Sequence, residues 1–429
     1  MKKIFLAILL LTGPGFAALH AQQAPTDLQQ LVNQSFEHYK QIKALQTQQR
    51  IAADQTDLTK TQRMPQVHGD VSYMHLYPAP KLDFGGAAFQ PFPSENVNVG
   101  VSGRQLLLDF GKSGSAIARS QAQQNLLSMQ TDEAKEQLAF QVAAVYLNIA
   151  YLRNNIDVQD ANIKLLEETE KIVQQRLKNG DAIDLELLNT QVKLENYRNR
   201  KIEYRNQLEK QVANMQYLTG SPDQSGIRAD FSWPAAPQQM LVDTAALAEN
   251  AAIKTSLEKE RVAEMELKSV KRDFTPSLYL DAGTGVKNGY LPDVNTPKWN
   301  YNAGVSLAIP IYNGKRNKLQ ESIAAKQVEA AKWNTAGVKD NVVKEIAQQN
   351  SDIQSNRERL KTADVLLRQA DRAVQLAQSR YKNGVITYLD LQNAQTSLLE
   401  AQLSKIQYQY QLSISSLELL HLNGNQFWR

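Results

Sequence analysis

Alternation of apolar and polar residues with a period of two marks four short stretches of the chain. Between 300 and 311 the odd-numbered residues are mainly apolar, and the even-numbered ones are mainly polar or small. Val97, Val99 and Val101 alternate in the same way with polar or small neighbours. A period of two with one apolar face predicts half-buried β-strands. We therefore expect strands at 65–77, 96–109, 275–286 and 299–311.

Two very long segments follow the strand pairs and contain no proline. They run from about Lys112 to Lys178 and from about Lys315 to Lys382. As α-helices they would each extend for about 100 Å. Both end in Lys-Asn-Gly, and Gly180 and Gly384 can take the left-handed conformation that closes a helix.

The two helix ends belong to a longer internal repeat. The segments 176–220 and 380–424 align without gaps at an offset of 204, and 16 of their 45 positions are identical. Such self-similarity indicates a duplication. The order along the chain is then a first repeat with its tip at 179–183, a linker, a second repeat with its tip at 383–387, and a short tail. The expected bounds of these four parts are 22–220, 221–242, 243–424 and 425–429.

The helix that starts at Tyr388 has two apolar seams on nearly opposite sides, with polar residues between them. One polar side holds Asp390 and Asn393, and the other holds Gln395, Gln402 and Gln409. A two-stranded coiled coil needs only one seam. Two seams predict helices on both sides and water on both surfaces, as in a wall around an aqueous channel. A thick soluble bundle is the alternative, because the matching second seam of the first half is half polar at Leu188, Val192, Glu195, Asn199 and Ile202.

The N-terminus and the composition restrict the location. Residues 1–21 read as a secretory signal peptide, with Lys2 and Lys3 before the apolar run Ile4–Leu11 and small residues up to Ala21. The chain has no cysteine, and its net charge of +4 is low for 429 residues, so no nucleic-acid partner is expected. No later apolar stretch reaches the 18 residues of a membrane-spanning helix. Four strands cannot close a barrel, so a membrane location would require several chains, although soluble four-stranded sheets also exist.

Enzyme chemistry finds little support in the sequence. Gly111, Lys112 and Ser113 lack the first glycine of a phosphate-binding loop, because Leu106 stands in its place. His68 and His75 lie seven residues apart on one strand and so face opposite sides. We expect no enzyme activity, no cofactor and no metal site.

The order and spacing of these features are similar to those of the TolC-like outer-membrane efflux proteins. The features are the duplicated halves, the hairpin tips of the form R-x-x-x-G with a following L-x-N-x-Q, the junctions LLLDFGK and IPIYNGK, and the strand starts at Pro65 and Pro276. The resemblance implies a mainly α fold with a small β part, in which each chain contributes four strands. It further implies a homotrimer with an α-helical tunnel across the periplasm and a shared twelve-stranded β-barrel in the outer membrane. Such a protein is the exit duct of a tripartite efflux or type I secretion system.

The resemblance also implies partners and sites. The partners are a periplasmic adaptor protein, an inner-membrane pump and outer-membrane lipid. The tips would dock the adaptor through Lys178, Asn179, Gly180, Asp181, Lys382, Asn383, Gly384 and Val385. Candidates for a pore constriction are Glu186, Asn189, Asp390 and Asn393. Asp390 could instead only favour a helix N-terminus, and Ile386 stands where some members have a basic residue that latches the mouth.

A second function remains open at this point. A secreted or periplasmic coiled-coil scaffold or adhesin without a pore would share the long helices and the signal peptide. Fractionation distinguishes the two, because a duct must pellet with the outer membrane whereas a scaffold would be soluble.

Overall fold

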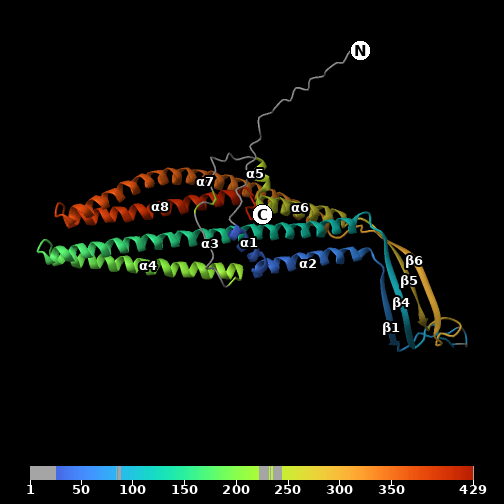
Figure 1. Ribbon diagram of the computed structural model, residues 1–429. Helices are drawn as coiled ribbons and strands as arrows, with labels where there is room; N and C mark the ends of the chain where they lie inside the picture. Colours follow the sequence, from blue (N-terminus) through green and yellow to red (C-terminus); the bar gives the residue numbers. More distant parts are fainter. Residues whose placement is uncertain are drawn as a thin grey trace, which may run out of the picture. The chain divides into compact units, whose positions relative to one another are not determined.

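The computed structural model describes residues 26–428, without 84, 86–87, 222–230, 232 and 235–243 (Figure 1). The expected signal peptide and most of the expected linker 221–242 lie outside these residues. The chain divides into two compact units. The hairpin unit comprises Met1–Tyr39, Lys135–Asn250 and Val342–Arg429, and the strand unit comprises Lys40–Ala134 and Ala251–Asn341. Each unit therefore contains segments from both sequence repeats.

The duplication is exact in the lengths of the long helices. Helix α3 (Lys112–Lys178) and helix α7 (Arg316–Lys382) each have 67 residues and start 204 positions apart. The returning helices α4 (Asp184–Thr219) and α8 (Tyr388–Leu422) start at the same offset. A helix of 67 residues is about 100 Å long, as the absence of proline predicts.

The strand unit contains one antiparallel sheet of four strands in the order β1-β4-β5-β6. These strands are β1 (Gln66–His75), β4 (Glu95–Leu108), β5 (Ser277–Lys287) and β6 (Lys298–Ala308), all within one to three residues of the expected starts and ends. A second, two-stranded sheet pairs β2 (Leu82–Asp83) with β3 (Ala88–Phe89). The pairing of β4 with β5 joins the two sequence repeats, and it aligns Arg104 with Asp281. Helix α2 (Lys40–Lys60), the 3-10 turn η1 (Thr61–Arg63) and helix α6 (Ala251–Arg272) belong to the same unit, as do the first parts of α3 and α7.

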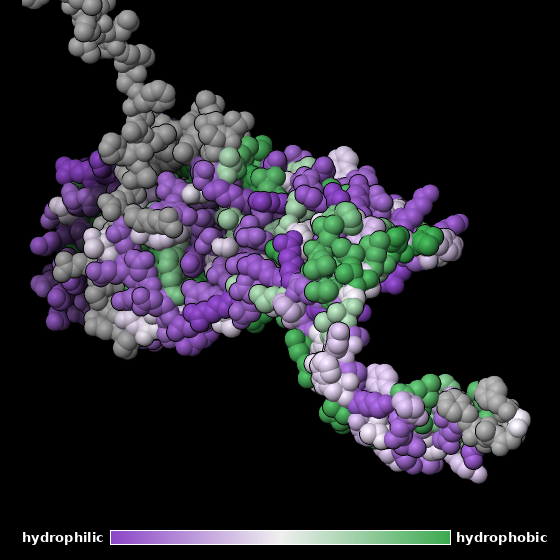
Figure 2. All heavy atoms as spheres, turned by 90° about the vertical axis from the view of Figure 1, so that its right-hand side faces the viewer, coloured by the Kyte–Doolittle hydropathy of each residue, from purple (hydrophilic) through white to green (hydrophobic). Residues whose placement is uncertain are grey.

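The two faces of the sheet differ in polarity, as the alternation predicts. Val71, Val99 and Tyr301 lie on the apolar face, whereas Asp70, Arg104 and Asp281 lie on the other. The expectation that the strands are half-buried is wrong for the single chain, because Val71 is 80% exposed and Tyr301 is 72% exposed. Figure 2 shows green, apolar side chains at the surface of this unit. Period two therefore identified an apolar face correctly, but no other element among the described residues covers that face.

The hairpin unit packs the α3–α4 pair against the α7–α8 pair, with α8 next to α3 (Figure 1). Helix α1 (Thr26–His38) contacts α4, and the short helix α5 (Thr244–Glu249) belongs to this unit and precedes α6 in the sequence. Phe427 and Trp428 are buried in the same unit, where Trp428 contacts Phe36 and Phe427 contacts Trp233. None of the helices in the described ranges is both long and apolar enough to cross a lipid bilayer.

Candidate functional site at the helical tips

Both long helices close with the same hydrogen-bonded turn. Gly180 has φ of 79° and Gly384 has φ of 73°, a left-handed conformation that glycine adopts without strain. The N–H of Asp181 donates to the carbonyl of Arg176 (2.8 Å), and the N–H of Val385 donates to that of Arg380 (2.9 Å). With the N–H of each glycine bonded three residues back, this is the Schellman motif. The prediction that Gly180 and Gly384 close the two long helices is confirmed.

The residues expected to dock an adaptor are exposed at these turns. Lys178, Asn179, Gly180 and Asp181 surround the first turn, and Lys382, Asn383, Gly384 and Val385 surround the second. Apolar side chains accompany them: the exposed fraction of Val385 is 68%, that of Leu389 is 63% and that of Ile183 is 59%. A small exposed apolar surface with lysines at its rim is typical of a contact surface for another protein.

Arg176 connects the two tips. One terminal nitrogen donates to the carbonyl of Tyr381 (2.6 Å), and the other donates to the carbonyl of Asp181 in its own turn (2.9 Å). The guanidinium carbon also lies 4.4 Å from the centre of the Tyr381 ring, within the range of a cation–π interaction. Because the planar guanidinium serves three partners at once, it fixes the first turn against the end of α7.

Tyr381 in turn contacts the start of α4. Its ring is buried, and its hydroxyl donates to a carboxylate oxygen of Glu186 (2.5 Å). Burial, together with the hydrogen bond to Glu186, raises the pKa of Tyr381 far above its ordinary value, so the hydroxyl remains a donor. Glu186 is one of the candidate constriction residues, and in this structure its carboxylate joins the two hairpins.

A second polar cluster lies one turn further from the tips. The hydroxyls of Thr190 and Tyr388 are 2.6 Å apart, and the amide of Gln392 donates to the same Tyr388 oxygen (2.6 Å). Lys193 donates to the hydroxyl of Thr396 (2.8 Å) and has no carboxylate within ion-pairing distance among the described residues. Burial lowers the pKa of Lys193. These contacts join α4 to α8.

Asp390 forms a capping box with Thr387 at the start of α8. The Thr387 hydroxyl accepts from the N–H of Asp390 (3.2 Å), and the Asp390 carboxylate accepts from the N–H of Thr387 (3.0 Å). The side-chain and backbone hydrogen bonds of Thr387 lower the pKa of Asp390. The structure thus gives Asp390 a capping role, while the side chains of Asn189 and Asn393 are exposed and make no hydrogen bond in the described part of the chain. A constriction formed by these four residues stays a prediction.

Apolar clusters and polar contacts alternate along the interface between the hairpins. Val173, Ala377, Tyr381, Tyr388 and Leu391 form one buried cluster. Further along, Gln395 donates to Thr169 (2.8 Å) and Asn162 donates to Gln402 (2.7 Å), each across the boundary from α3 to α8. Gln395 is only 2% exposed. The prediction that the side of α8 with Gln395 faces water is therefore wrong, because α3 covers it.

Sequence reasoning missed Arg176, Thr190, Tyr381 and Tyr388 as the residues that join the hairpins. The repeat alignment held a signal for three of them. At these positions the copies differ, with Leu177 opposite Tyr381, Asp184 opposite Tyr388 and Ala394 opposite Thr190. The positions that are identical in the two sequence repeats form the shared turn. The positions that differ form the contact between the two hairpins of the chain.

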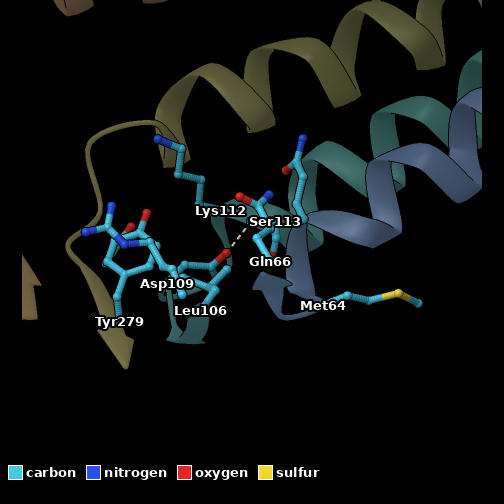
Figure 3. A pocket seen from close by; sticks show the side chains of 10 residues that line it. Met64, Gln66, Leu106, Asp109, Lys112, Ser113 and Tyr279 are labelled. Atoms are coloured by element: carbon cyan, nitrogen blue, oxygen red, sulfur yellow. Dashed lines mark hydrogen bonds between the residues drawn. The ribbon is translucent and has the colours of Figure 1, made fainter. Parts of the chain in front are cut away.

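The strand unit contains a separate pocket of about 340 Å³ where the sheet meets the start of α3 (Figure 3). Arg104, Asp109, Lys112 and Tyr279 are among its lining residues. Arg104 donates to Asp281 (2.6 Å) and lies 5.2 Å from the centre of the Tyr279 ring. The Asp109 carboxylate accepts from the N–H of Ser113 (2.6 Å), the bond drawn as a dashed line, and so caps α3. With its acid engaged in this way, the pocket offers charge pairing and stacking rather than acid–base chemistry.

Among the residues that the structure describes, no group of three or more His, Cys, Asp or Glu side chains could hold a metal ion.

The chain matches the family model of the outer membrane efflux proteins over residues 31–221 and 244–425. The chain belongs to this family. As an outer membrane efflux protein it is a channel of the outer membrane, and the predicted fold class, mainly helical with a small antiparallel sheet, is confirmed.

Relatives and solved structures agree with this assignment. The chain is 22% identical to the alkaline protease secretion protein AprF of Pseudomonas aeruginosa, over 72% of this chain and 66% of AprF. It is 22% identical to the outer membrane efflux protein BepC of Brucella suis, over 76% of this chain and 72% of BepC. The crystal structure of the outer membrane protein VceC of Vibrio cholerae has the same fold, with a TM-score of 0.78 at 18% identity over 94% of this chain and 97% of VceC.

Proposed function

We propose that this outer membrane efflux protein is the homotrimeric exit duct of a tripartite efflux or type I secretion system. The observation that carries the proposal is the four-stranded sheet, whose outer strands β1 and β6 each have an edge that no described strand pairs. One face of this sheet is an exposed apolar surface that includes Val71 and Tyr301. Open edges are not tolerated in lipid. Three copies joined edge to edge would form a closed sheet of twelve strands with its apolar face toward the lipid.

The long helices support the same assembly. Helix α4 exposes Leu188, Val192 and Ile202, which are 57%, 61% and 64% exposed, and helix α7 exposes Leu366 and Leu376. These residues lie on sides of α4 and α7 that no other helix in the described part of the chain covers. An apolar helix side is stable in water only when a partner covers it. Packing of α7 of one copy against α4 of the next would cover both sides.

The tips suit the contact with the other components of such a system. Their exposed Val385, Leu389 and Ile183 stand beside Lys178 and Lys382, a surface suited to a periplasmic adaptor that in turn holds an inner-membrane pump. The duct itself would carry out no chemistry and would use no cofactor. Small molecules or polypeptides would pass through it. Two relatives are named for such transport, one for alkaline protease secretion and one for cation efflux.

Fractionation followed by native mass spectrometry tests the proposal. The duct must pellet with outer membranes, and detergent-extracted protein must have three times the mass of the processed chain. A monomeric protein recovered in the soluble periplasmic fraction would instead indicate the alternative, a scaffold or adhesin without a pore.

A further inference from the structure

The end of the sheet farthest from α6 and α7 carries two lysines directly opposite each other (Figure 1). Lys287 is the last residue of β5 and Lys298 is the first residue of β6, and the register of the sheet pairs them. Like charges at directly opposed positions of two antiparallel strands are destabilising. A pairing that works against the stability of the sheet indicates a role in binding or transport.

Both ammonium groups lie against the loop that joins the two strands. The Nζ atom of Lys298 is 3.4 Å from the carbonyl oxygen of Tyr290 and 3.3 Å from that of Leu291. The Nζ atom of Lys287 lies 5.3 Å from the centre of the Tyr290 ring, within the range of a cation–π interaction. An ammonium group has three N–H donors, so these contacts leave donors on both lysines for an anionic ligand.

The carboxylates near this end of the sheet have other partners. Glu95 lies on the opposite, apolar face, where it accepts from the hydroxyl of Tyr73 and lies 2.7 Å from Nδ1 of His75. Asp293 lies in the loop and accepts from the hydroxyl of Thr296. Among the described residues, no carboxylate is within ion-pairing distance of either lysine, so their charge is not neutralised by an ion pair.

The two lysines lie on the polar face of the sheet. Arg104 and Asp281, on the same face nearer the helices, form an ion pair (2.6 Å) and offset each other. Asp70 places a negative charge nearer the middle of this face. In the proposed trimer the apolar face meets the lipid, so the polar face lines the interior and the lysines stand at its outer opening.

We propose that Lys287 and Lys298 attract small anions, such as carboxylates and phosphates, to the outer opening of the duct. The proposal rests on the homotrimeric duct proposed above, in which two lysines from each of three copies form a ring of six ammonium groups. Rings of lysine or arginine side chains favour anions in pores. The field of the ring extends for about 10 Å at 0.1 M salt, so it acts on solutes that pass close to the wall.

The ion preference of purified protein in planar lipid bilayers tests the ring. The ratio of chloride to potassium permeability is obtained from the reversal potential under a gradient of potassium chloride. We expect Lys287→Gln/Lys298→Gln to lower this ratio by about two- to fivefold, because the positive potential at the opening is lost. Lys287→Arg/Lys298→Arg keeps the charge and should keep the ratio. Equal ratios in the glutamine variant and the unmodified protein would overturn the proposal.

Glu95→Gln is the matched control, because it removes a charge at the same end of the sheet but on the opposite face. The amide of glutamine can still bond with Tyr73 and His75, and we expect the permeability ratio to stay close to that of the unmodified protein. A change as large as that in the lysine variant would show that the effect does not depend on the inward face, and it would contradict the ring.

Binding of pyranine, a dye with three sulfonate groups, measures the same site without transport. Fluorescence anisotropy of the dye with purified protein at low salt should show about tenfold weaker binding to Lys287→Gln/Lys298→Gln and unchanged binding to the arginine variant. Conducting channels whose permeability ratio and dye binding do not depend on the lysines would overturn the ring and leave the duct. Monomers that conduct no ions but bind the dye through the lysines would overturn the duct, and with it the ring.

Discussion

The guanidinium of Arg176 bonds the carbonyl of Tyr381 at 2.6 Å, although the two residues are 205 positions apart. This contact, with the bond from Tyr381 to Glu186, joins three of the four long helices within one side-chain length of the turns. The tips of a chain therefore form one hydrogen-bonded body rather than two independent loops.

Removal of the Tyr381 hydroxyl should loosen the tips. Tyr381→Phe keeps the buried ring and loses the bond to Glu186, so we expect a loss of about 1 kcal/mol in the free energy of unfolding, since Glu186 is partly exposed. Hydrogen exchange at 176–190 and 380–392 should rise. Tyr204→Phe on α4 is the control, because the Tyr204 hydroxyl makes no hydrogen bond among the described residues. Equal exchange in both variants would show that the bond does not hold the tips.

The second turn should not tolerate proline. Gly384 has φ of 73° and donates its N–H to Tyr381 (3.0 Å), whereas proline fixes φ near −65° and has no N–H. We expect Gly384→Pro to abolish efflux while trimers persist, as measured by tolerance to toxic compounds and by native mass spectrometry. Gly384→Asn, which tolerates the left-handed conformation, should cost only about 1 kcal/mol and retain efflux. Unchanged tolerance in the proline variant would argue against a role of the tip in transport.

The amide contact between α3 and α8 should show strong coupling. Thr169→Val removes the acceptor of the Gln395 amide, whose oxygen already lacks a partner, and should destabilise the protein by about 1–3 kcal/mol. Thr169→Val/Gln395→Leu removes both polar groups and should lie within about 1 kcal/mol of the original protein. Thermal unfolding of Thr169→Val, Gln395→Leu and the double variant measures the coupling. If the stability lost in the double variant equals the sum of the losses in the two single variants, the residues are not coupled.

Because of Lys193, we expect the stability of the protein to increase with pH in the alkaline range. Burial holds its folded pKa below the ordinary value of 10.5, so the unfolded chain binds more protons between the two values. Stability contributed by this residue therefore increases as pH rises through the folded pKa and levels off above 10.5. Lys193→Met should remove that rise. Identical pH profiles of unfolding temperature for the two proteins, from neutral pH to about 10.5, would exclude the assigned burial effect.

Much of the fold followed from local pattern. Helix ends at Gly180 and Gly384 could be predicted because the left-handed turn depends on residues that are adjacent in sequence. The strands could be predicted because period two is a local property. The pattern could not say what covers a face, and so the exposed Val71 and the buried Gln395 were both assigned to the wrong environment.

The candidate site was predictable only in part for the same reason. The turn residues lie in a duplicated motif and were found directly. Tyr381, Thr190 and Tyr388 act through contacts between segments about 200 residues apart, which no local pattern records. Asp390 was given two alternative roles. The geometry of Thr387 at the helix start shows that Asp390 forms a capping box, and its part in a constriction stays a prediction.

The equal lengths of α3 and α7, 67 residues each, have a consequence for how this protein can change over time. Deleting one residue from α3 alone would draw its end back by about 1.5 Å and rotate it by about 100°, turning Arg176 away from Tyr381. A change in the length of the long helices must therefore occur in both sequence repeats at once. The lengths of α3 and α7 are therefore expected to stay equal when the protein evolves, because a change in one helix requires the same change in the other.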